Sequence, residues 1–318
     1  MMKILITLFL LLFFSTRTCL AQSIQDNEVT DNENSLLWKI SGNDLQHDSY
    51  LLGTMHNVER TFLDSISGFR KAFKAAKQIA IECDIFTQDI NNRSKPKELK
   101  DYVFMPNDTS YAMLYSSNDL QFIDSILKKY NPAYYKYKPM LWSGILGSVA
   151  AVDNIKNVQS TLDGFILLMG YQNNKKIHFM ETLESVGQKW AEYDSLNYMM
   201  DLHYQAKTLQ NTLKHPNSIR SFLNQMKMYY FKQELNHLTM DFLAKQIGID
   251  NEPEFVLDRY KHTEFLLVTT RNEEWMKNLI PMIHEDSSLI AVGATHLIGI
   301  NGLIAKLRNL GYNVDPMR

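Results

Sequence analysis

Short apolar segments and longer amphipathic ones alternate near both ends of the chain. Residues 36–40 and 50–53 are apolar runs separated by Ser-Gly-Asn-Asp, which predicts a β-hairpin. Residues 59–77 carry a large apolar side chain every three or four positions, as an amphipathic helix does. Residues 78–84 then read as a buried strand. The first unit is therefore predicted to be strand, Gly-x-x-His turn, helix and strand.

The C-terminal end repeats this plan. Residues 288–292 form an apolar strand, Gly293-Ala294-Thr295-His296 forms the turn, and residues 299–310 have helical periodicity. Gly311 would end that helix and residues 312–314 would add a last strand. If both units share one sheet, their turns meet at the carboxyl edge of the strands, where open α/β sheets bind ligands.

The middle of the chain is predicted to be a large helical insertion, about residues 119–279, rich in Met, Tyr and Leu. Within it only residues 176–180 resemble a strand. We therefore predict an α/β (α+β) fold, in which the N- and C-terminal βα units build a central mixed sheet and the insertion shapes a cleft. Residues 36–318 would form a single domain.

A secretory signal peptide is predicted for residues 1–21. Lys3 precedes an apolar run over residues 4–14, and a small and polar stretch ends at Ala21. The run is shorter than the roughly 20 residues that a membrane-spanning helix needs, and no later run is long enough. We expect cleavage before Gln22, export to the periplasm or the extracellular space, and no membrane span.

Lipid attachment at Cys19 is an alternative anchor. Such sites usually have small residues before the cysteine, whereas Arg17 and Thr18 stand there, so this anchor is disfavoured. Once the leader is removed, Cys83 is the single cysteine, which excludes a disulfide within the chain. Residues 22–35 are polar and rich in Asn, Asp and Glu, which predicts a disordered leader.

Charge gives little information on partners. The chain has 33 basic and 35 acidic residues, and Lys3 and Arg17 would leave with the signal peptide. The absence of a basic tract argues against nucleic acid as a partner. A hydrophobic content of 45% is enough for one large core or for two smaller cores in contact. The oligomeric state cannot be read from these features.

His56 and His296 are the strongest candidates for chemistry, because each ends a Gly-x-x-His that follows an apolar strand. Glycine permits a sharp turn at the strand end. Two imidazoles above the same sheet edge could share one divalent metal. Either histidine alone would be read as a core residue with a hydrogen-bond partner, but the repetition in matching contexts favours a joint role.

Several charged residues stand near the predicted strand ends. Glu82 lies inside an apolar strand, where an unpaired carboxylate is costly; the alternative is a solvent-facing edge position. Glu181 follows the strand at residues 176–180. Asp163 is at a predicted helix start, where an N-cap role is the simpler interpretation. Arg271 could neutralise the carboxylates or hold a carbonyl or phosphate, unless it forms a surface ion pair.

The ordered series of motifs resembles the TraB/GumN family, which includes the TIKI metalloproteases. The motifs are Leu51-Leu52-Gly53-Thr54-Met55-His56, Ile81-Glu82, Leu162-Asp163, Met180-Glu181-Thr182, Arg271-Asn272 with Trp275, and Val292-Gly293-Ala294-Thr295-His296. The resemblance implies an α/β core with a helical insert and a metal-dependent peptidase site made of His56, His296 and Glu82, with Arg271 nearby. His178-Phe179 departs from the Gly-Leu usual in the family.

Our leading hypothesis is an exported metal-dependent hydrolase that acts on a peptide or protein. His56, His296 and Glu82 would hold Mn, Co or Zn, which would activate a water molecule. Glu181 is the candidate general base and Arg271 would stabilise the oxyanion. The alternative is an envelope protein that binds a peptide, haem or another small ligand in the same cleft without turning it over.

Overall fold

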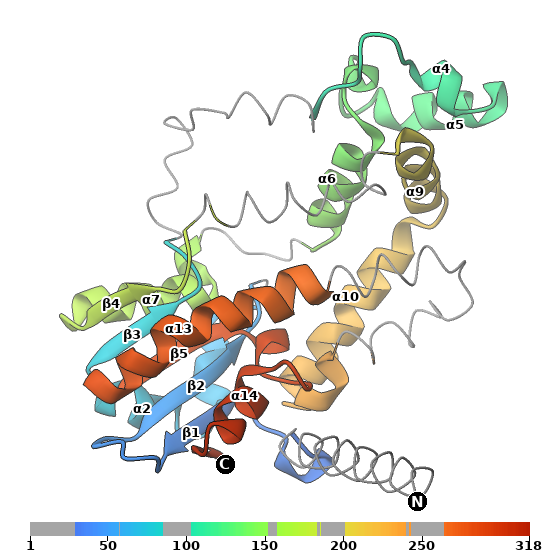
Figure 1. Ribbon diagram of the computed structural model, residues 1–318. Helices are drawn as coiled ribbons and strands as arrows, with labels where there is room; N and C mark the ends of the chain where they lie inside the picture. Colours follow the sequence, from blue (N-terminus) through green and yellow to red (C-terminus); the bar gives the residue numbers. More distant parts are fainter. Residues whose placement is uncertain are drawn as a thin grey trace, which may run out of the picture.

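A computed structural model of the protein describes residues 29–56, 58–84, 103–151, 158–182, 185, 201–239, 242 and 264–318. The predicted signal peptide lies outside these residues. Six strands form one mixed sheet in the order β4-β3-β5-β2-β1-β6 (Figure 1). The strands are β1 (Leu37–Ser41), β2 (Ser49–Thr54), β3 (Gln78–Ile81), β4 (Lys176–Phe179), β5 (Ser288–Gly293) and β6 (Asn313–Pro316).

The central strands of the sheet are parallel and buried. β3 pairs with β5 and β5 pairs with β2, each in parallel register, and β4 adds to the outer side of β3. β1 is antiparallel to both β2 and β6. Parallel strands covered on both faces favour continuous apolar runs, as in Leu-Ile-Ala-Val of β5. The carboxyl ends of β3, β5 and β2 therefore stand side by side.

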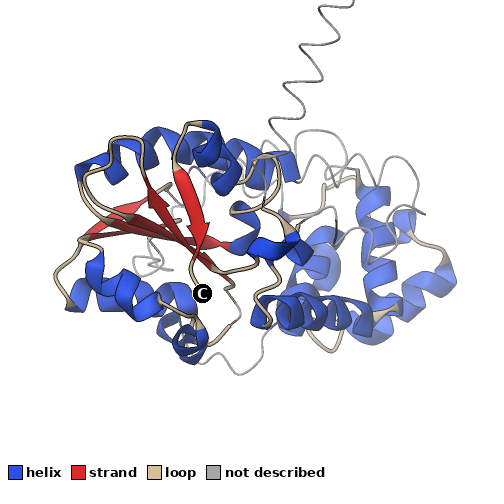
Figure 2. Ribbon diagram, turned by 90° about the horizontal axis from the view of Figure 1, so that it is seen from below, coloured by secondary structure: helices blue, strands red, loops and turns tan. Residues whose placement is uncertain are grey.

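Helices cover both faces of the sheet (Figure 2). α13 (Thr270–Glu285) lies along one face, and α2 (Phe69–Ala75) and α7 (Leu162–Gln172) lie on the other (Figure 1). α7 approaches closely because Gly170 has no side chain: a Cβ there would lie 2.7 Å from Cδ1 of Ile177. The buried core includes Trp38 and Trp275, both fully buried.

A second, helical region stands beyond one end of the sheet (Figure 1). It contains α4 (Tyr111–Leu114), α5 (Ser117–Leu127), α6 (Pro139–Ala151) and α9 (Leu202–Lys214). Its own core consists of Tyr111, Ile123, Leu127, Tyr134, Trp142, Leu209 and Leu213. α10 (Pro216–Phe231) returns to the sheet, where the buried Tyr230 hydroxyl donates to the Gly53 carbonyl at 2.8 Å.

The predicted fold class is confirmed, and all six predicted strands are present within two residues of their expected bounds, apart from the shorter β3. The prediction of one continuous helix over residues 59–77 is wrong. This segment divides into the 3₁₀ helix η2 (Arg60–Ser65) and α2, because Gly68 between them has a left-handed φ of 79°. A Cβ at Gly68 would also lie 2.7 Å from Cε of Met317.

The last predicted helix also begins later than expected. After β5 the chain forms a 3₁₀ turn, η8 (Ala294–His296), and α14 runs only from Leu303 to Asn309. At Gly302 the backbone passes so close to the Ile298 carbonyl that a Cβ would lie 2.4 Å from its oxygen. This tight loop replaces the first turn of the predicted helix.

The described end of the predicted leader is tied to the sheet domain. Glu33 accepts from Nη2 of Arg308 at 2.7 Å, and Ser35 is buried with its hydroxyl donating to the Met317 carbonyl at 2.8 Å. Among the described helices, none is long and apolar enough to cross a membrane.

Candidate functional site

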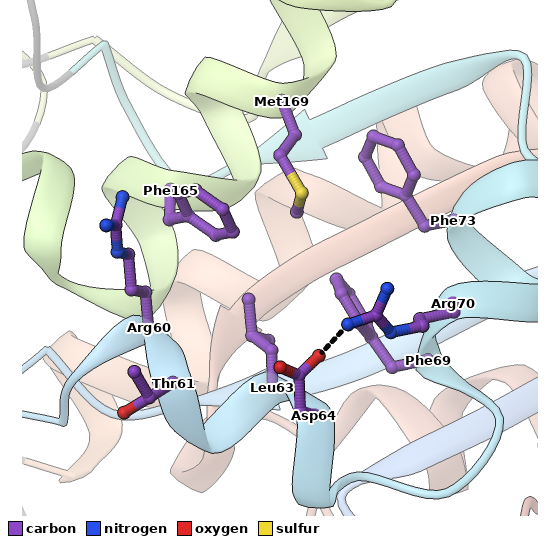
Figure 3. Close-up of a pocket in the computed structure, with 9 residues that line it drawn as sticks. All are labelled: Arg60, Thr61, Leu63, Asp64, Phe69, Arg70, Phe73, Phe165 and Met169. Atoms are coloured by element: carbon purple, nitrogen blue, oxygen red, sulfur yellow. Dashed lines mark hydrogen bonds and ion pairs between the residues drawn. The ribbon is translucent and has the colours of Figure 1, made fainter.

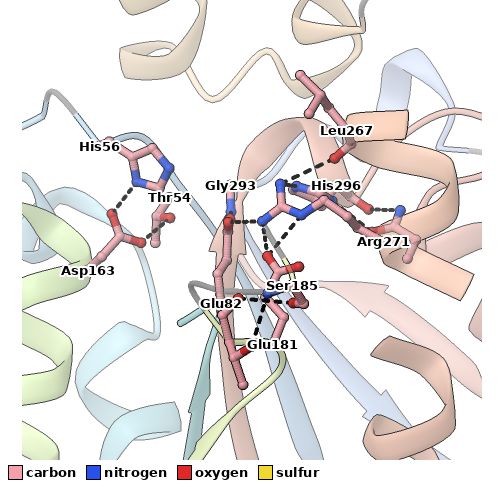
Figure 4. Close-up of polar contacts among 12 residues, drawn as sticks. Thr54, His56, Glu82, Asp163, Glu181, Ser185, Leu267, Arg271, Gly293 and His296 are labelled. Atoms are coloured by element: carbon pink, nitrogen blue, oxygen red, sulfur yellow. Dashed lines mark hydrogen bonds and ion pairs between the residues drawn. The ribbon is translucent and has the colours of Figure 1, made fainter. Parts of the chain in front are cut away.

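The candidate residues come from the adjacent ends of parallel strands (Figure 4). Glu82 follows β3, Glu181 lies two residues beyond β4, and His296 ends the turn after β5. The structure brings these three side chains together around Arg271 of α13. His56 follows β2 and stands to one side of this cluster, turned toward Asp163 (Figure 4).

Arg271 is the centre of the cluster and uses all five of its N–H donors. Nε donates to Glu181 Oε1 at 2.9 Å, and Nη2 donates both to Glu181 and to Glu82 Oε2, the latter at 2.6 Å. Nη1 donates to the Leu267 carbonyl at 3.2 Å and to His296 Nε2 at 3.1 Å. Burial lowers the pKa of Arg271, but the two carboxylates raise it more. The guanidinium is therefore a permanent positive charge with no spare donor.

The hydrogen bonds around His296 fix its tautomer. Arg271 can only donate, so Nε2 of His296 must accept, and the proton lies on Nδ1. Nδ1 lies 2.8 Å from Oδ1 of Asn272, whose own Nδ2 donates to the carbonyls of His296 and Asn301 at 3.0 and 2.9 Å. The ring packs on Trp275 with a centroid distance of 4.4 Å. His296 is thus a neutral, buried imidazole whose Nε2 lone pair faces Arg271.

His56 is held differently. Its ring is 73% exposed, and Nδ1 lies 3.0 Å from Oδ2 of Asp163. Asp163 also accepts from Thr54 Oγ1 at 2.5 Å. The hydrogen bond that His56 donates to the Asp163 carboxylate is the main cause that raises the pKa of His56 to about 9. His56 therefore carries a proton on Nε2 at neutral pH, which any metal would have to displace.

Asp163 does not act as an N-cap. That role belongs to Thr161, whose hydroxyl accepts from the Gly164 N–H at 3.1 Å. Asp163 sits in the first turn of α7, where the helix dipole favours a negative charge, and its carboxylate points at His56 (Figure 4). The residue expected to be a helix cap is instead the side chain that orients a candidate ligand.

Glu82 faces the site rather than solvent. Its Oε1 accepts from the Gly293 N–H at 2.7 Å while Oε2 accepts from Arg271, and its side chain is 12% exposed. Burial works to raise the pKa of Glu82, but the positive charge of Arg271 and the hydrogen bond from the Gly293 N–H hold it below the ordinary value. A Cβ on Gly293 would lie 3.2 Å from Oε1, so glycine permits this close approach.

The candidate ligands His56, His296 and Glu82 are of chemical types that bind divalent metals, because they offer imidazole nitrogens and a carboxylate. In the arrangement observed, Arg271 lies between Glu82 and His296 and occupies an acceptor atom of each. Among the residues that the structure describes, no three His, Cys, Asp or Glu side chains stand close enough to hold one ion together. The chemistry of the set fits a metal, and the guanidinium would have to withdraw for one to bind.

A separate cavity of about 470 Å³ lies between η2, α2 and α7 (Figure 3). Its lining is mostly apolar, with two arginines among the polar residues: Arg60, Thr61, Leu63, Asp64, Phe69, Arg70, Phe73, Phe165 and Met169. None of the candidate site residues lines it.

Two residues orient the histidines, and the sequence pattern does not predict that role for either. The sequence places Asn272 only beside Arg271, and it favours a helix cap at Asp163. Asn272 is fully buried in a helix whose other buried residues are mostly apolar, such as Trp275 and Leu279. A polar residue on the apolar stripe of a predicted helix is the sequence signal that could have identified it.

A model of the TraB/PrgY/gumN family matches residues 36–316. No curated protein and no solved structure matches the chain. The match spans both Gly-x-x-His turns and the helical region between them. The chain therefore belongs to the TraB/PrgY/gumN family.

Proposed function

We propose that this protein is a metal-dependent hydrolase that cleaves peptides, with His56, His296 and Glu82 as the ligands of Mn²⁺, Co²⁺ or Zn²⁺. One observation carries the proposal. Each histidine has its Nδ1 engaged by a side-chain acceptor, Asp163 for His56 and Asn272 for His296. Metal-binding histidines are typically held in this way, with the other ring nitrogen left for the ion.

The roles of the remaining residues follow from their positions. Glu181, buried beside Arg271 at the carboxyl end of β4, is the proposed general base. Arg271 is the proposed donor to the oxyanion that develops on the scissile carbonyl. A divalent cation at this place would acidify a water molecule and polarise the carbonyl. A peptide substrate is inferred from the resemblance to the TIKI metalloproteases.

Export is part of the proposal. A signal peptide at residues 1–21 would deliver the mature chain to the periplasm or the extracellular space. There the site would meet peptides or exposed protein segments.

Metal content and turnover test the proposal together. Residues 22–318 would be purified as wild type, His56→Ala and His296→Ala, loaded with each metal, desalted and analysed by elemental mass spectrometry. We expect about one equivalent in the wild type and loss of it in each variant. The loaded proteins would then be incubated with a defined peptide library and the products read by mass spectrometry.

The possible outcomes separate the two hypotheses. Cleavage by the metal-loaded wild type, abolished in both variants, supports the hydrolase. Retention of intact peptide with metal bound supports the binding protein instead. A wild type that takes up none of the three metals contradicts the proposed site.

A further inference from the structure

The cluster around Arg271 already contains a cation. The Arg271 side chain is 13% exposed, and its guanidinium lies over the Trp275 ring at 4.7 Å from the centroid and pairs with Glu82 and Glu181. Buried carboxylates of this kind need a positive partner, because an uncompensated buried charge is strongly unfavourable. In the metal-free protein Arg271 supplies that charge.

Arg271 and a metal would compete for the same atoms. Nε2 of His296 has a single lone pair, and it now accepts from Nη1 of Arg271. The Oε2 atom of Glu82 accepts from Nη2, while Oε1 is held by the Gly293 N–H. Binding of an ion through His296 Nε2 therefore requires the guanidinium to give up that hydrogen bond, and repulsion between the two cations opposes the one to Glu82 Oε2.

We propose that Arg271 is an internal placeholder cation, which fills the position between Glu82 and His296 until a divalent metal displaces it and frees two of its N–H donors for substrate. This inference rests on the metal site proposed above. It resolves the conflict between the oxyanion role of Arg271 and the present use of all its donors.

The remaining contacts would hold Arg271 after displacement. Nε and the second N–H of Nη2 would stay with Glu181, and the second N–H of Nη1 would stay with the Leu267 carbonyl. The guanidinium would remain over the Trp275 ring. Leu267 lies in η7 (Phe265–Thr269), a π-helical turn directly before α13. Such turns are rare and are often found at functional sites. The two released donors would then be free to donate to a substrate carbonyl.

Arg308 offers a matched control within the same chain. It is 14% exposed, stacks over Trp38 at 5.5 Å and pairs with Glu33, so its burial and contacts resemble those of Arg271. Its hydrogen bonds go to the Glu33 carboxylate and the Val314 carbonyl, and neither residue is a candidate metal ligand. Arg308→Met should cost stability without changing metal affinity.

The decisive experiment compares metal affinity in wild type, Arg271→Met and Arg308→Met, by calorimetric titration with Zn²⁺ and by the visible absorption of bound Co²⁺. Removing the competing cation leaves two buried carboxylates unpaired. We expect Arg271→Met to bind at least about tenfold more tightly than wild type, about 1.4 kcal/mol, and Arg308→Met to match wild type. Metal should also raise the Tm of Arg271→Met by more than that of wild type.

Each result has a distinct meaning. Equal or weaker binding by Arg271→Met, with wild type still binding, overturns the placeholder and leaves the metal site intact. Binding by neither protein overturns both. Binding by Arg271→Met alone would show that Arg271 blocks the site and is not displaced by a metal, which also overturns the placeholder.

A measurement on the wild type covers the case in which Arg271→Met does not fold. The guanidinium N–H signals of both buried arginines can be followed by ¹⁵N NMR while Zn²⁺, a diamagnetic ion, is added. The Nη signals of Arg271 should shift as the bonds to Glu82 and His296 are lost, while the Nε signal of Arg308 stays in place. Unchanged Arg271 signals at full Zn²⁺ occupancy would contradict displacement.

Discussion

The two Gly-x-x-His turns have the same sequence pattern and opposite environments. His56 after β2 is 73% exposed and its Nδ1 faces the Asp163 carboxylate. His296 after β5 is 4% exposed, packs on Trp275 and has its Nδ1 toward the Asn272 amide. One imidazole is an exposed, charged group at the surface, and the other is a neutral group buried in the core.

The difference shows that the motif specifies position, while the residue that contacts Nδ1 specifies charge. A carboxylate stabilises the imidazolium, whereas an amide can only accept from the neutral or charged ring. The pair thus combines one rigid ligand candidate with one that can respond to solvent and substrate.

The largest effect is expected from removing the residue that orients the buried ring. Asn272→Leu would leave Nδ1 of His296 and the carbonyls of His296 and Asn301 without this partner in a buried place. Each unsatisfied buried group costs about 1–3 kcal/mol, so we expect a loss of about 3 kcal/mol or more in the free energy of unfolding. Urea unfolding followed by circular dichroism would measure it.

Asp163→Leu is the matched change at the exposed turn. Asp163→Leu removes the acceptor of the buried Thr54 hydroxyl, but water can reach His56, so the destabilisation should be smaller than that caused by Asn272→Leu. Equal losses of unfolding free energy in the two variants would contradict the difference between the buried and the exposed turn.

The glycines of the two motifs should also differ. A Cβ on Gly53 would lie 3.2 Å from the Cα of Ala294, which is backbone and cannot yield. We expect Gly53→Ala to cost about 1–3 kcal/mol through overpacking. At Gly293 the near neighbour is the Glu82 carboxylate at 3.2 Å, a side-chain end.

Gly293→Ala should therefore disturb metal binding more than folding, and Gly53→Ala should do the reverse. Thermal unfolding and Zn²⁺ titration of both variants would test this. A Gly293→Ala protein with the same metal affinity as wild type would argue against Glu82 as a ligand.

A smaller effect is expected at the bond that links the helical region to the first turn. Tyr230 donates to the Gly53 carbonyl from a fully buried position. Tyr230→Phe keeps the ring and removes one hydrogen bond, which should cost about 1 kcal/mol in urea unfolding. A variant as stable as wild type would mean that this bond does not help to anchor α10.

The sequence predicts the strands that position the site better than it predicts the hydrogen bonds between the site residues. Apolar runs place the strands, and parallel pairing then brings Glu82, His56 and His296 to one edge. The contact between Arg271 and Glu82 joins residues far apart in the chain, and no periodicity encodes it. The break at Gly68 depends on packing against Met317 from the last strand region, which is also a tertiary effect. The local pattern of apolar residues therefore predicts the helices and strands, whereas the hydrogen-bond partners can be identified only from the three-dimensional structure.

The sharpest effect on charge is expected from Asp163→Asn. In metal-free wild type the pKa of His56 is raised from 6.5 to about 9, first of all by the hydrogen bond with Asp163. An amide removes the negative charge, so the pKa should fall back toward 6.5. Because the folded pKa is raised, the stabilisation by this pair is full below pH 6.5 and is lost as the pH rises through about 9. Histidine ring signals in NMR, followed between pH 5 and 10, would give both midpoints, and the stability of Asp163→Asn should lose that pH dependence. An unchanged midpoint in Asp163→Asn would mean that the turn itself, rather than the carboxylate, sets the charge of His56, and the contrast between the two turns would then lie in burial alone.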